Sequence, residues 1–309
     1  MDSGQAQFPG YPSESRACGL APTRPWSESD TVAGMGEKKP VTIDDLKARG
    51  FEIEYLSHAR AILSVDFPEA LTELAAVLDK ATIPIEEIIA GGGGEAKGTQ
   101  RLRRALTELK WPKTTFTVEK RINGSPREAI SHEIDHVRSF EAGTIALEIE
   151  WNNKDPFFDR DLENYKRLHA DGAISAGIII TRGKSLHDNM KTLVRKFIDE
   201  RQIQSFDGLK EWGYEPTAKQ RKAVDTRVNR KKKPLTWREA FVDKFVNDKF
   251  AESTTHWKKL EDRVHRGVGN PCPLLLIGMP DSIVTFHEGK KALEEVLEAE
   301  DDEPEETES

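Results

Sequence analysis

The chain has 309 residues, 37% of them hydrophobic and 32% charged, which allows one large or two ordinary domains with a buried core and a strongly polar surface. No apolar run approaches the roughly 18 residues of a membrane span, which argues against a membrane protein. The N-terminus lacks a basic segment followed by an apolar one, and the two cysteines have no metal-ligand spacing. These features predict a cytoplasmic protein with reduced thiols, no secretory signal and no membrane partner.

The negative charge of the chain is concentrated at its C-terminus. The net charge is −8, but residues 294–309 carry ten acids and no bases, so that residues 1–293 have a net charge of +2. We expect this acidic tail to be disordered. The opposite pattern occurs from Lys219 to Lys233, where eight Lys and Arg residues, among them Lys231 and Lys232, accompany a single Asp. Such a run is either a surface that grips phosphates or an ordinary solvated face, and composition leaves both open.

The first part of the chain predicts a disordered leader followed by helices and one strand. Residues 1–34 are rich in Gly, Pro and Ser without periodicity, and we expect order to begin near Met35, a candidate start of the protein. The segment 51–56 is typical of a strand, whereas 66–81 and 99–109 have apolar residues at helical spacing. Four glycines before the second helix lack the GK[ST] ending and the preceding strand of a phosphate loop, which favours a flexible loop.

From residue 114 onward the order of elements indicates a mixed sheet. Three β-rich runs come first, at 114–122, 127–140 and 143–151. A helix (159–172) and a strand (176–183) follow, and then a charged, mostly helical stretch that extends to about residue 249. A further helix (253–269) and a last strand (273–279) complete the order. This order predicts an α/β (α+β) domain over 35–293, in which helices flank a mixed central sheet. The charged, mostly helical stretch at about 186–249 would be an insert in this domain.

Three acids stand inside β-prone sequence. Asp135 lies in "EIDHV", and Glu148 and Glu150 lie in "ALEIEW". The strand period of two puts Glu148 and Glu150 on one face, and a neighbouring strand would aim Asp135 at the same point. Like charges at one point repel, so a cation should neutralise them, and oxygen ligands of this kind suit Mg²⁺. A Mg²⁺ ion held there polarises a phosphate and steadies a leaving oxygen, as in metal-dependent phosphodiesterases.

Spacing alone leaves other interpretations of these residues open. The acids can be ordinary polar residues on the wet face of an antiparallel hairpin, because a D…ExE match also arises by chance. His132 and His136 flank the first acid and are potential metal ligands, but no Cys/His cluster accompanies them. Histidines at the surface, or satisfied by hydrogen bonds, are the alternative.

The surrounding sequence resembles the type II restriction endonucleases of the BglII/BstYI (BamHI-like) family. The similar patches keep the family's order and spacing, and they are "SHARAIL", "GTQRLRRALTELKW", "EIDHV", "ALEIEWNN", "GIIITRG", "STTHWKKLEDRV" and "PLLLIG". They cover roughly residues 50–185 and 250–280. The resemblance implies a PD-(D/E)xK, restriction-endonuclease-like core, a homodimer, Mg²⁺ and double-stranded DNA. The stretch from about 186 to 249 is much longer than in the family.

The resemblance also implies roles for the acids. Asp135 and Glu148 match the family's two metal-binding acids. Glu150 stands where most of the superfamily has lysine, and it would position or activate the attacking water. A further acid or amide that supports the family's site falls near Lys113 or Thr114, where we can assign none.

Two segments match regions that read bases in the family. Asn152 and Asn153 follow the acid-bearing strand, and their carboxamides donate and accept at once, which suits the major-groove edge of adenine. The loop before the late helix supplies Ser253, Thr254 and Thr255. Helix capping is the alternative role for these three hydroxyls.

These inferences predict a homodimeric, Mg²⁺-dependent type II restriction endonuclease that hydrolyses double-stranded DNA at a short palindrome and leaves 5′-phosphate ends. Its host would need a cognate DNA methyltransferase, which we do not expect as a stable partner. The alternatives are a repair or structure-specific nuclease on the same core and a non-catalytic DNA-binding protein. The intact set of acids argues against the last, and discrete DNA fragments would exclude the repair nuclease.

Overall fold

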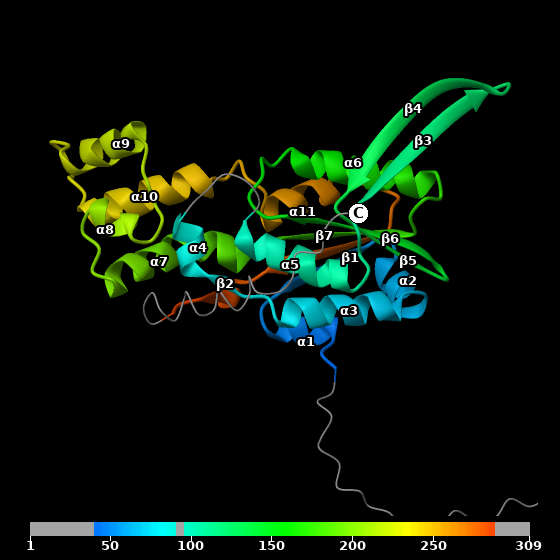
Figure 1. Cartoon of the computed structure of the whole chain (residues 1–309), viewed down its shortest axis with the longest axis horizontal. Helices are drawn as coiled ribbons and strands as arrows, with labels where there is room; N and C mark the ends of the chain where they lie inside the picture. Colours follow the sequence, from blue (N-terminus) through cyan, green and yellow to red (C-terminus); the bar gives the residue numbers. More distant parts are fainter. Residues whose placement is uncertain (1–39, 91–95, 288–309) are drawn as a thin grey trace, which may run out of the picture. The chain divides into compact units, whose positions relative to one another are not determined.

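Five strands form a mixed sheet through the middle of the structure (Figure 1). Their order is β1 (Glu52–Leu56), β8 (Leu274–Met279), β7 (Ala176–Arg182), β6 (Gly143–Glu150) and β5 (His136–Phe140). The two outer pairs are antiparallel, whereas β8, β7 and β6 run parallel to one another. The computed structural model describes residues 40–90 and 96–287; the predicted leader, the start at Met35, the glycine loop and the acidic tail lie outside these residues.

The two faces of this sheet are covered by separate apolar clusters. Alternate residues of β6 and β7 enter different clusters, because successive strand residues point to opposite faces: Ile149 and Ile180 belong to one cluster, and Ala146 and Ile179 to the other. The first cluster contains residues of α1, α3, α4, α5, α7 and α10, and the second contains residues of α6 and α11. Helices on both faces of a mixed sheet confirm the predicted α+β class and give a restriction-endonuclease-like architecture.

The predicted helical segments are helices to within a few residues, and Ile43–Ala48 and Ile85–Ala90 are helices that were not predicted. Their bounds are α1 Ile43–Ala48, α2 Ala59–Val65, α3 Pro68–Asp79, α4 Ile85–Ala90, α5 Lys97–Glu108, α6 Phe157–Ala170, α7 Lys184–Glu200, α8 Asp207–Lys210, α9 Ala218–Val228, α10 Trp237–Lys249 and α11 Trp257–His265. A short 3-10 helix (Asp281–Ile283) leads into β9 (Val284–Thr285), which pairs with β2 (Ile83–Pro84). No helix among residues 40–90 and 96–287 is long and apolar enough to cross a membrane.

One predicted strand is divided between two sheets. The run 127–140 was expected to be a single β segment, but the structure ends β4 (Ser125–Ile134) before Asp135 and begins β5 after it. Strand β4 pairs with β3 (Thr114–Ile122) as a separate hairpin that extends away from the central sheet (Figure 1). Its turn residues Asn123 and Gly124 both have positive φ, as a tight hairpin turn requires. The chain therefore changes sheets at Asp135.

The charged stretch at about 186–249 is helical, as predicted. It forms α7 to α10, and α9 packs on α10, which in turn packs on α7. Aromatic side chains supply its core, where Phe206 and Trp237 both lie against Phe241. Figure 1 shows α8, α9 and α10 together at one end of the described part of the chain, with the β3–β4 hairpin at the other end.

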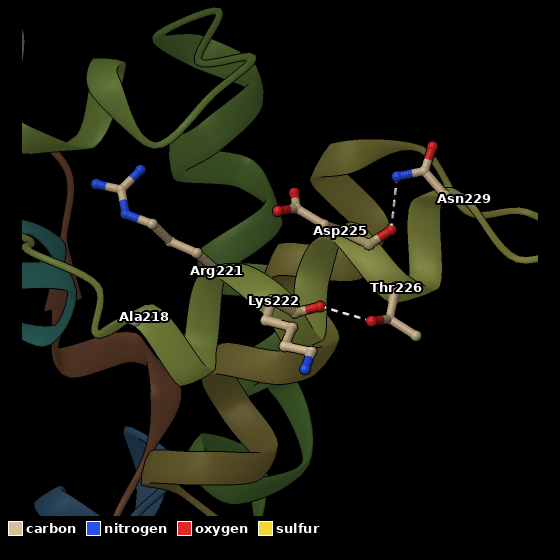
Figure 2. A pocket seen from close by; sticks show the side chains of 6 residues that line it. All are labelled: Ala218, Arg221, Lys222, Asp225, Thr226 and Asn229. Carbon is tan, nitrogen blue, oxygen red and sulfur yellow. Dashed lines mark hydrogen bonds between the residues drawn. The ribbon is translucent and has the colours of Figure 1, made fainter.

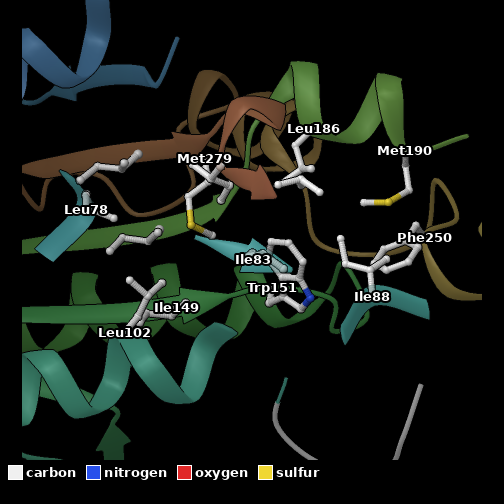
Figure 3. Packing of buried hydrophobic residues seen from close by; sticks show 14 of the residues in the cluster. Leu78, Ile83, Ile88, Leu102, Ile149, Trp151, Leu186, Met190, Phe250 and Met279 are labelled. Carbon is white, nitrogen blue, oxygen red and sulfur yellow. The ribbon is translucent and has the colours of Figure 1, made fainter. Parts of the chain in front are cut away.

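The residue after β6 is anchored in the larger apolar cluster. Trp151 is 9% exposed and belongs to the same cluster as Ile83, Ile88 and Phe250, as Figure 3 shows. A large buried ring at this point fixes where β6 ends, and therefore where the side chains just before and after Trp151 are held.

Candidate active site

Strand β6 presents two buried carboxylates on the face that α6 covers. Glu148 and Glu150 are 2% and 3% exposed, and Ile149 between them packs into the cluster on the opposite face. The strand period thus places both acids on one side, as the sequence predicted. Acids are rarely buried so completely without a partner of opposite charge, so their burial points to a functional role.

Asp135 joins this pair from the break between β4 and β5. The antiparallel register pairs His136 with Leu147, and one further step along it sets Asp135 opposite Glu148. Unlike Glu148, Asp135 is exposed. Protonated Glu148 donates a hydrogen bond to Asp135, which places the two carboxyl groups side by side. The change of sheet is therefore what turns Asp135 toward β6.

A fourth carboxylate, which the sequence analysis missed, comes from α6. Asp161 is fully buried, on the helix face that also buries Phe158, Leu162 and Tyr165. Its Oδ2 atom accepts no hydrogen bond from an amide, hydroxyl or cationic group in the described part of the chain. Among the described residues, a protonated Glu150 would offer Asp161 a further donor. The available signal was an acid on the apolar stripe of an otherwise amphipathic helix.

Burial and neighbouring negative charge raise the pKa values of Glu148, Glu150 and Asp161. Burial is the largest cause for Glu148, whose pKa lies well above the usual value, followed by the charges of Asp161 and Asp135. Burial and the charge of Asp161 raise the pKa of Glu150 to about 8, although a hydrogen bond from Asn153 opposes this shift. Burial also raises the pKa of Asp161, against the charge of Arg160. Without a further cation, the site therefore holds protons at neutral pH.

Cationic and amide groups partly offset this negative charge. Arg160 Nε donates to Asp161 Oδ1 at 2.8 Å, and Arg160 Nη2 lies 3.6 Å from Glu150 Oε1. Asn153 Nδ2 donates to Glu150 Oε2 at 2.8 Å. Lys113 Nζ forms an ion pair with Glu133 Oε1 at 2.6 Å, and the negative charges of Asp135 and Glu148 also raise the pKa of Lys113. Lys113 is one of the two positions at which no supporting acid or amide could be assigned from the sequence, and the structure places a positive charge there.

The donor set fits a hard divalent cation. It consists of carboxylate oxygens, one of which (Asp161 Oδ2) is buried without a donor, and the acids outnumber the nearby cations. Oxygen-only sites with several carboxylates are typical of Mg²⁺. A bound cation would favour the ionised forms of these acids and relieve the repulsion that raises their pKa values.

The two predicted base-reading segments lie side by side, although about 100 residues of chain separate them. Thr255 N donates to Asn153 O at 2.8 Å, and Asn153 N donates to Thr255 Oγ1 at 3.1 Å. Asp155 N donates to Ser253 O at 3.0 Å, and Lys154 and Thr254 form an isolated β-bridge. The backbone of the segment that follows the acid-bearing strand thus lies against the 253–255 loop.

A buried arginine holds the two loops together. Arg182, at the end of β7, is fully buried and donates to Trp151 O, Thr254 Oγ1 and Thr255 O at 2.7–2.8 Å. Burial lowers its pKa to about 9. Because it contacts both segments, Arg182 fixes the position of one loop relative to the other. Its place after "AGIIIT" gave no hint of this role, since the partners are distant in sequence.

The side chains in these loops differ in their burial and in their hydrogen-bond partners. Thr255 is fully buried and its hydroxyl accepts from the backbone N–H of Asn153, so burial keeps it from a base, whereas Ser253 is exposed. Asn152 Oδ1 is buried without a partner in the described part of the chain. The alternative capping role is wrong for all three hydroxyls, because the N-cap of α11 is His256, which makes no side-chain capping bond.

The structure does not bring the basic run to the carboxylates. Lys231 and Lys232 are exposed and lie in the connection between α9 and α10. Along α9, Arg221 and Lys222 help to line an open hollow (Figure 2). The run therefore offers cationic side chains on a surface formed by the insert.

The two candidate histidine ligands beside Asp135 are buried and hydrogen-bonded instead. His132 Nδ1 lies 2.8 Å from Asn164 Oδ1, and His136 Nδ1 lies 3.3 Å from the carbonyl oxygen of Trp111. Burial is the main cause that lowers the pKa of His136. The alternative of satisfied histidines is thus confirmed for both.

A mixed sheet flanked by helices, with buried carboxylates at the end of a central strand, defines the restriction-endonuclease-like class. Within that class, the family model described as "Restriction endonuclease BglII/BglIII" matches residues 51–279, and the chain belongs to this family. The match spans β1 to β8 and includes every residue of the carboxylate site and both loops. No curated protein matches the chain in a sequence comparison. Family membership establishes a nuclease that acts on DNA.

Proposed function

We propose that the protein is a Mg²⁺-dependent type II restriction endonuclease that cuts both strands of double-stranded DNA at a short palindrome. The observation that carries this proposal is the convergence of Asp135, Glu148, Glu150 and Asp161 beside the loops 152–155 and 251–255. Cleavage chemistry and base recognition would then act from one end of strand β6. The family match supports the nuclease class.

Asp135 and Glu148 would hold the metal ion, with Asp161 as a buried acid that adds negative charge beside them. When bound, Mg²⁺ supplies positive charge that stabilises the charge developing on the phosphate. The positive charge of a bound Mg²⁺ would lower the pKa of Glu150 from about 8, and the ionised carboxylate could then take a proton from water near neutral pH. Arg160 and Asn153 hold the Glu150 carboxyl group in place through contacts with its two oxygens.

The reaction we propose is hydrolysis of a phosphodiester. The oxygen of a water molecule bonds to phosphorus, Glu150 accepts the proton that this water loses, and the bond from phosphorus to the 3′ oxygen breaks. The 3′ oxygen takes a proton from solvent, which leaves a 3′-hydroxyl and a 5′-phosphate. No redox partner is needed.

Recognition would depend on the loops that Arg182 fixes together. Asn152, Ser253 and Thr254 are proposed to read base edges in the major groove. Asn153 would do so with the carboxamide oxygen and the N–H that its bond to Glu150 leaves over, and Thr255 would act mainly by fastening the loops. Lys231 and Lys232 are proposed to contact phosphates. A homodimer would present the same surface to each half of a palindrome, and a host methyltransferase would protect the host's own sites.

The test is to incubate the purified full chain and Mg²⁺ with a library of plasmids, and to sequence the ends. We expect discrete fragments that share one palindromic junction and carry 5′-phosphates. A ladder without sequence preference would favour a repair or structure-specific nuclease. Binding without any cleavage, at every divalent ion tested, would favour a non-catalytic DNA-binding protein.

A further inference from the structure

A second group of metal-ligating side chains joins α7 to the loop before α11. It consists of His187 in the first turn of α7, Glu252 in the loop and His256 at the N-cap of α11. One ligand atom from each residue lies within 4.8 Å of the other two. None of the three belongs to the carboxylate site at the end of β6.

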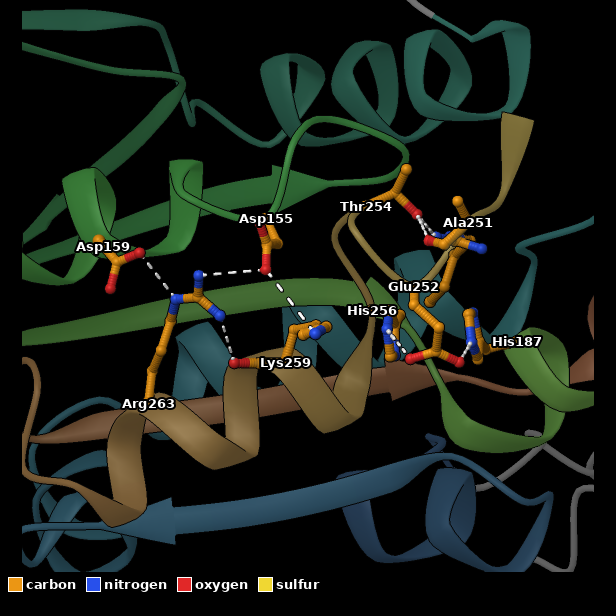
Figure 4. A network of polar contacts seen from close by, with 10 residues as sticks. Asp155, Asp159, His187, Ala251, Glu252, Thr254, His256, Lys259 and Arg263 are labelled. Carbon is orange, nitrogen blue, oxygen red and sulfur yellow. Dashed lines mark hydrogen bonds and ion pairs between the residues drawn. The ribbon is translucent and has the colours of Figure 1, made fainter. Parts of the chain in front are cut away.

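The Glu252 carboxylate lies at the edge of the two imidazole rings and contacts the Nε2 atom of each (Figure 4). Its Oε1 is 3.3 Å from His187 Nε2, and its Oε2 is 3.8 Å from His256 Nε2. The rings stack with centroids 3.8 Å apart and planes within 5° of parallel. Three residues from two segments thus direct two nitrogens and a carboxylate at one point.

His256 provides a second, independent sign of a ligand. It is 1% exposed, and its Nε2 atom is buried without a hydrogen-bond partner among the described residues. The ring does make a hydrogen bond with the backbone of Glu252, which must therefore use Nδ1. A histidine whose Nδ1–H is fixed by a backbone carbonyl leaves the Nε2 lone pair free, and this is the usual arrangement of a metal-binding histidine.

We propose that His187, Glu252 and His256 bind a transition-metal ion of the Zn²⁺ class, at a site separate from the Mg²⁺ site. Two imidazole nitrogens and one carboxylate oxygen are a donor set that suits Zn²⁺ or Co²⁺, whereas Mg²⁺ takes oxygen ligands almost entirely. The fourth position would be filled by water, because the Glu252 side chain is 76% exposed. Since a metal lies in the plane of each ligating ring, binding would turn the two rings out of their stack.

The surroundings are compatible with such an ion. Burial, followed by the charges of His187 and Arg182, lowers the pKa of His256 to about 4, so its ring is neutral at pH 7 and available as a ligand. The positive charges of Arg182 and Lys259 oppose a cation here, whereas the ionised Glu252 favours it. The donor carboxylate thus has to supply the compensating charge.

An ion at this site would tie α7 to the 251–256 loop. Thr254, which accepts from Arg182, is two residues from each of the metal-binding positions Glu252 and His256. The proposed ion would therefore fix the loop that lies against Asn153, without taking part in hydrolysis. This inference does not rest on the proposed cleavage reaction.

The test is titration of the metal-free full chain with Co²⁺, in excess Mg²⁺, followed by visible absorption. Four-coordinate Co²⁺ with nitrogen ligands absorbs much more strongly than six-coordinate Co²⁺ in an oxygen site. We expect one equivalent to give the strong spectrum, and Zn²⁺ to displace it. Zn²⁺ should also raise the melting temperature of the wild-type chain, since it binds only the folded state.

Variants of the three ligands decide the assignment. We expect His187→Ala and Glu252→Gln to weaken Co²⁺ binding by on the order of 100-fold or more, because they remove first ligands rather than supporting groups. His256→Ala should do the same, but it empties a buried position. Glu252 is exposed, so Glu252→Gln provides the decisive variant if His256→Ala does not fold.

The chain contains a matched control. Glu54, Glu261 and His265 form a similar group at the surface, with His265 Nε2 3.2 Å from Glu54 Oε1, but the His265 side chain is 56% exposed. We expect His265→Ala and Glu148→Gln to keep the strong Co²⁺ spectrum. Unchanged Co²⁺ affinity in His187→Ala and Glu252→Gln, or equal loss in His265→Ala, would overturn the proposal.

Discussion

Acids in two regions of this protein respond to folding in opposite directions. At the end of β6, burial and mutual repulsion raise the pKa values of Glu148, Glu150 and Asp161. In the insert, the pKa of Asp243 is lowered, first by a hydrogen bond from Lys191 at 2.7 Å and also by the charge of Arg227.

The difference shows what each group of acids does for the protein. A carboxylate whose pKa falls on folding stabilises the folded state at neutral pH, whereas one whose pKa rises opposes folding there. The insert acids therefore contribute stability, and the β6 acids cost stability unless a cation binds. Residues kept at such a cost are expected at a functional site.

The largest expected effect is the loss of cleavage when one of the two proposed metal-binding acids is removed. Asp135→Ala or Glu148→Ala should lower the cleavage rate by roughly 10³-fold or more, because the metal contributes several kcal/mol to transition-state stabilisation. The rate is measured on a cognate duplex in Mg²⁺, with circular dichroism as the test of folding.

Glu163→Ala is the matched control for this first prediction. Glu163 is an acid of α6 that pairs with Arg167 at the surface, and its replacement should leave cleavage unchanged. Near-normal cutting by either Asp135→Ala or Glu148→Ala would remove the metal assignment.

The second prediction concerns pH and the unfolding free energy. Because the pKa values of the β6 acids are raised, the folded protein keeps protons that the unfolded chain loses near pH 4.5. In EDTA, the contribution of these acids to the unfolding free energy should therefore be most favourable below about pH 4.5. It should decrease as pH rises toward about 8, the pKa of Glu150, by roughly 1.4 kcal/mol per pH unit for each proton that the folded protein retains. Urea unfolding at several pH values measures this.

Asp161→Asn sharpens the second prediction. This variant removes one of the repelling charges, so its unfolding free energy in EDTA should depend less on pH than that of the wild type. At pH 8 the variant should have the higher unfolding free energy. Added Mg²⁺ should stabilise the wild type more than the variant. Parallel profiles for the two proteins would show that the acids do not interact in this way.

The third prediction tests the packing that positions Asp161. A Cβ atom on Gly177 of β7 would lie 2.3–2.8 Å from ring atoms of Tyr165 in α6, including the ring carbon nearest the backbone. Gly177→Ala should therefore push α6 away, lower the unfolding free energy by about 1–3 kcal/mol and slow cleavage. Gly208→Ala in α8, whose nearest contact is 3.2 Å, is the control and should change both quantities little.

A fourth prediction separates base reading from phosphate binding. Lys231→Ala with Lys232→Ala should weaken binding to every sequence alike and reduce the salt slope by about one unit for each phosphate that is no longer neutralised. Asn153→Ala should instead cost about 1–3 kcal/mol at one base position while non-specific binding persists. Binding to cognate and scrambled duplexes is compared across salt concentrations. An unchanged salt slope in the double variant would make the basic run a solvated surface.

The smallest expected effect belongs to the insert acids. Asp243→Asn should lower the unfolding free energy at pH 7 by about 0.5 kcal/mol, because its ion pairs are largely exposed to solvent. Since the pKa of Asp243 is lowered, this contribution is present above pH 3.8 and disappears as pH falls below the folded pKa. A loss that persists at pH 2 would point to packing rather than charge.

Local pattern in the sequence was enough to predict most elements. Helical spacing over 66–81 and 99–109, and the apolar runs 176–183 and 273–279, correspond to α3, α5, β7 and β8 within a few residues. These features depend on residues two to four positions apart along the chain, and such spacings can be read directly from the sequence. The same-face arrangement of Glu148 and Glu150 followed from the strand period for the same reason.

Only the tertiary structure decided how distant segments meet. The run 127–140 is divided at Asp135 because β4 pairs with β3 whereas β5 pairs with β6. The sequence does not predict this division, because the residues of β4 and of β5 are equally typical of a strand. Asp161 joins the site because α6 packs over Gly177, and Arg182 connects loops about 100 residues apart. Such contacts have no periodic signature along the chain, because they are set by which surfaces bury each other when it folds.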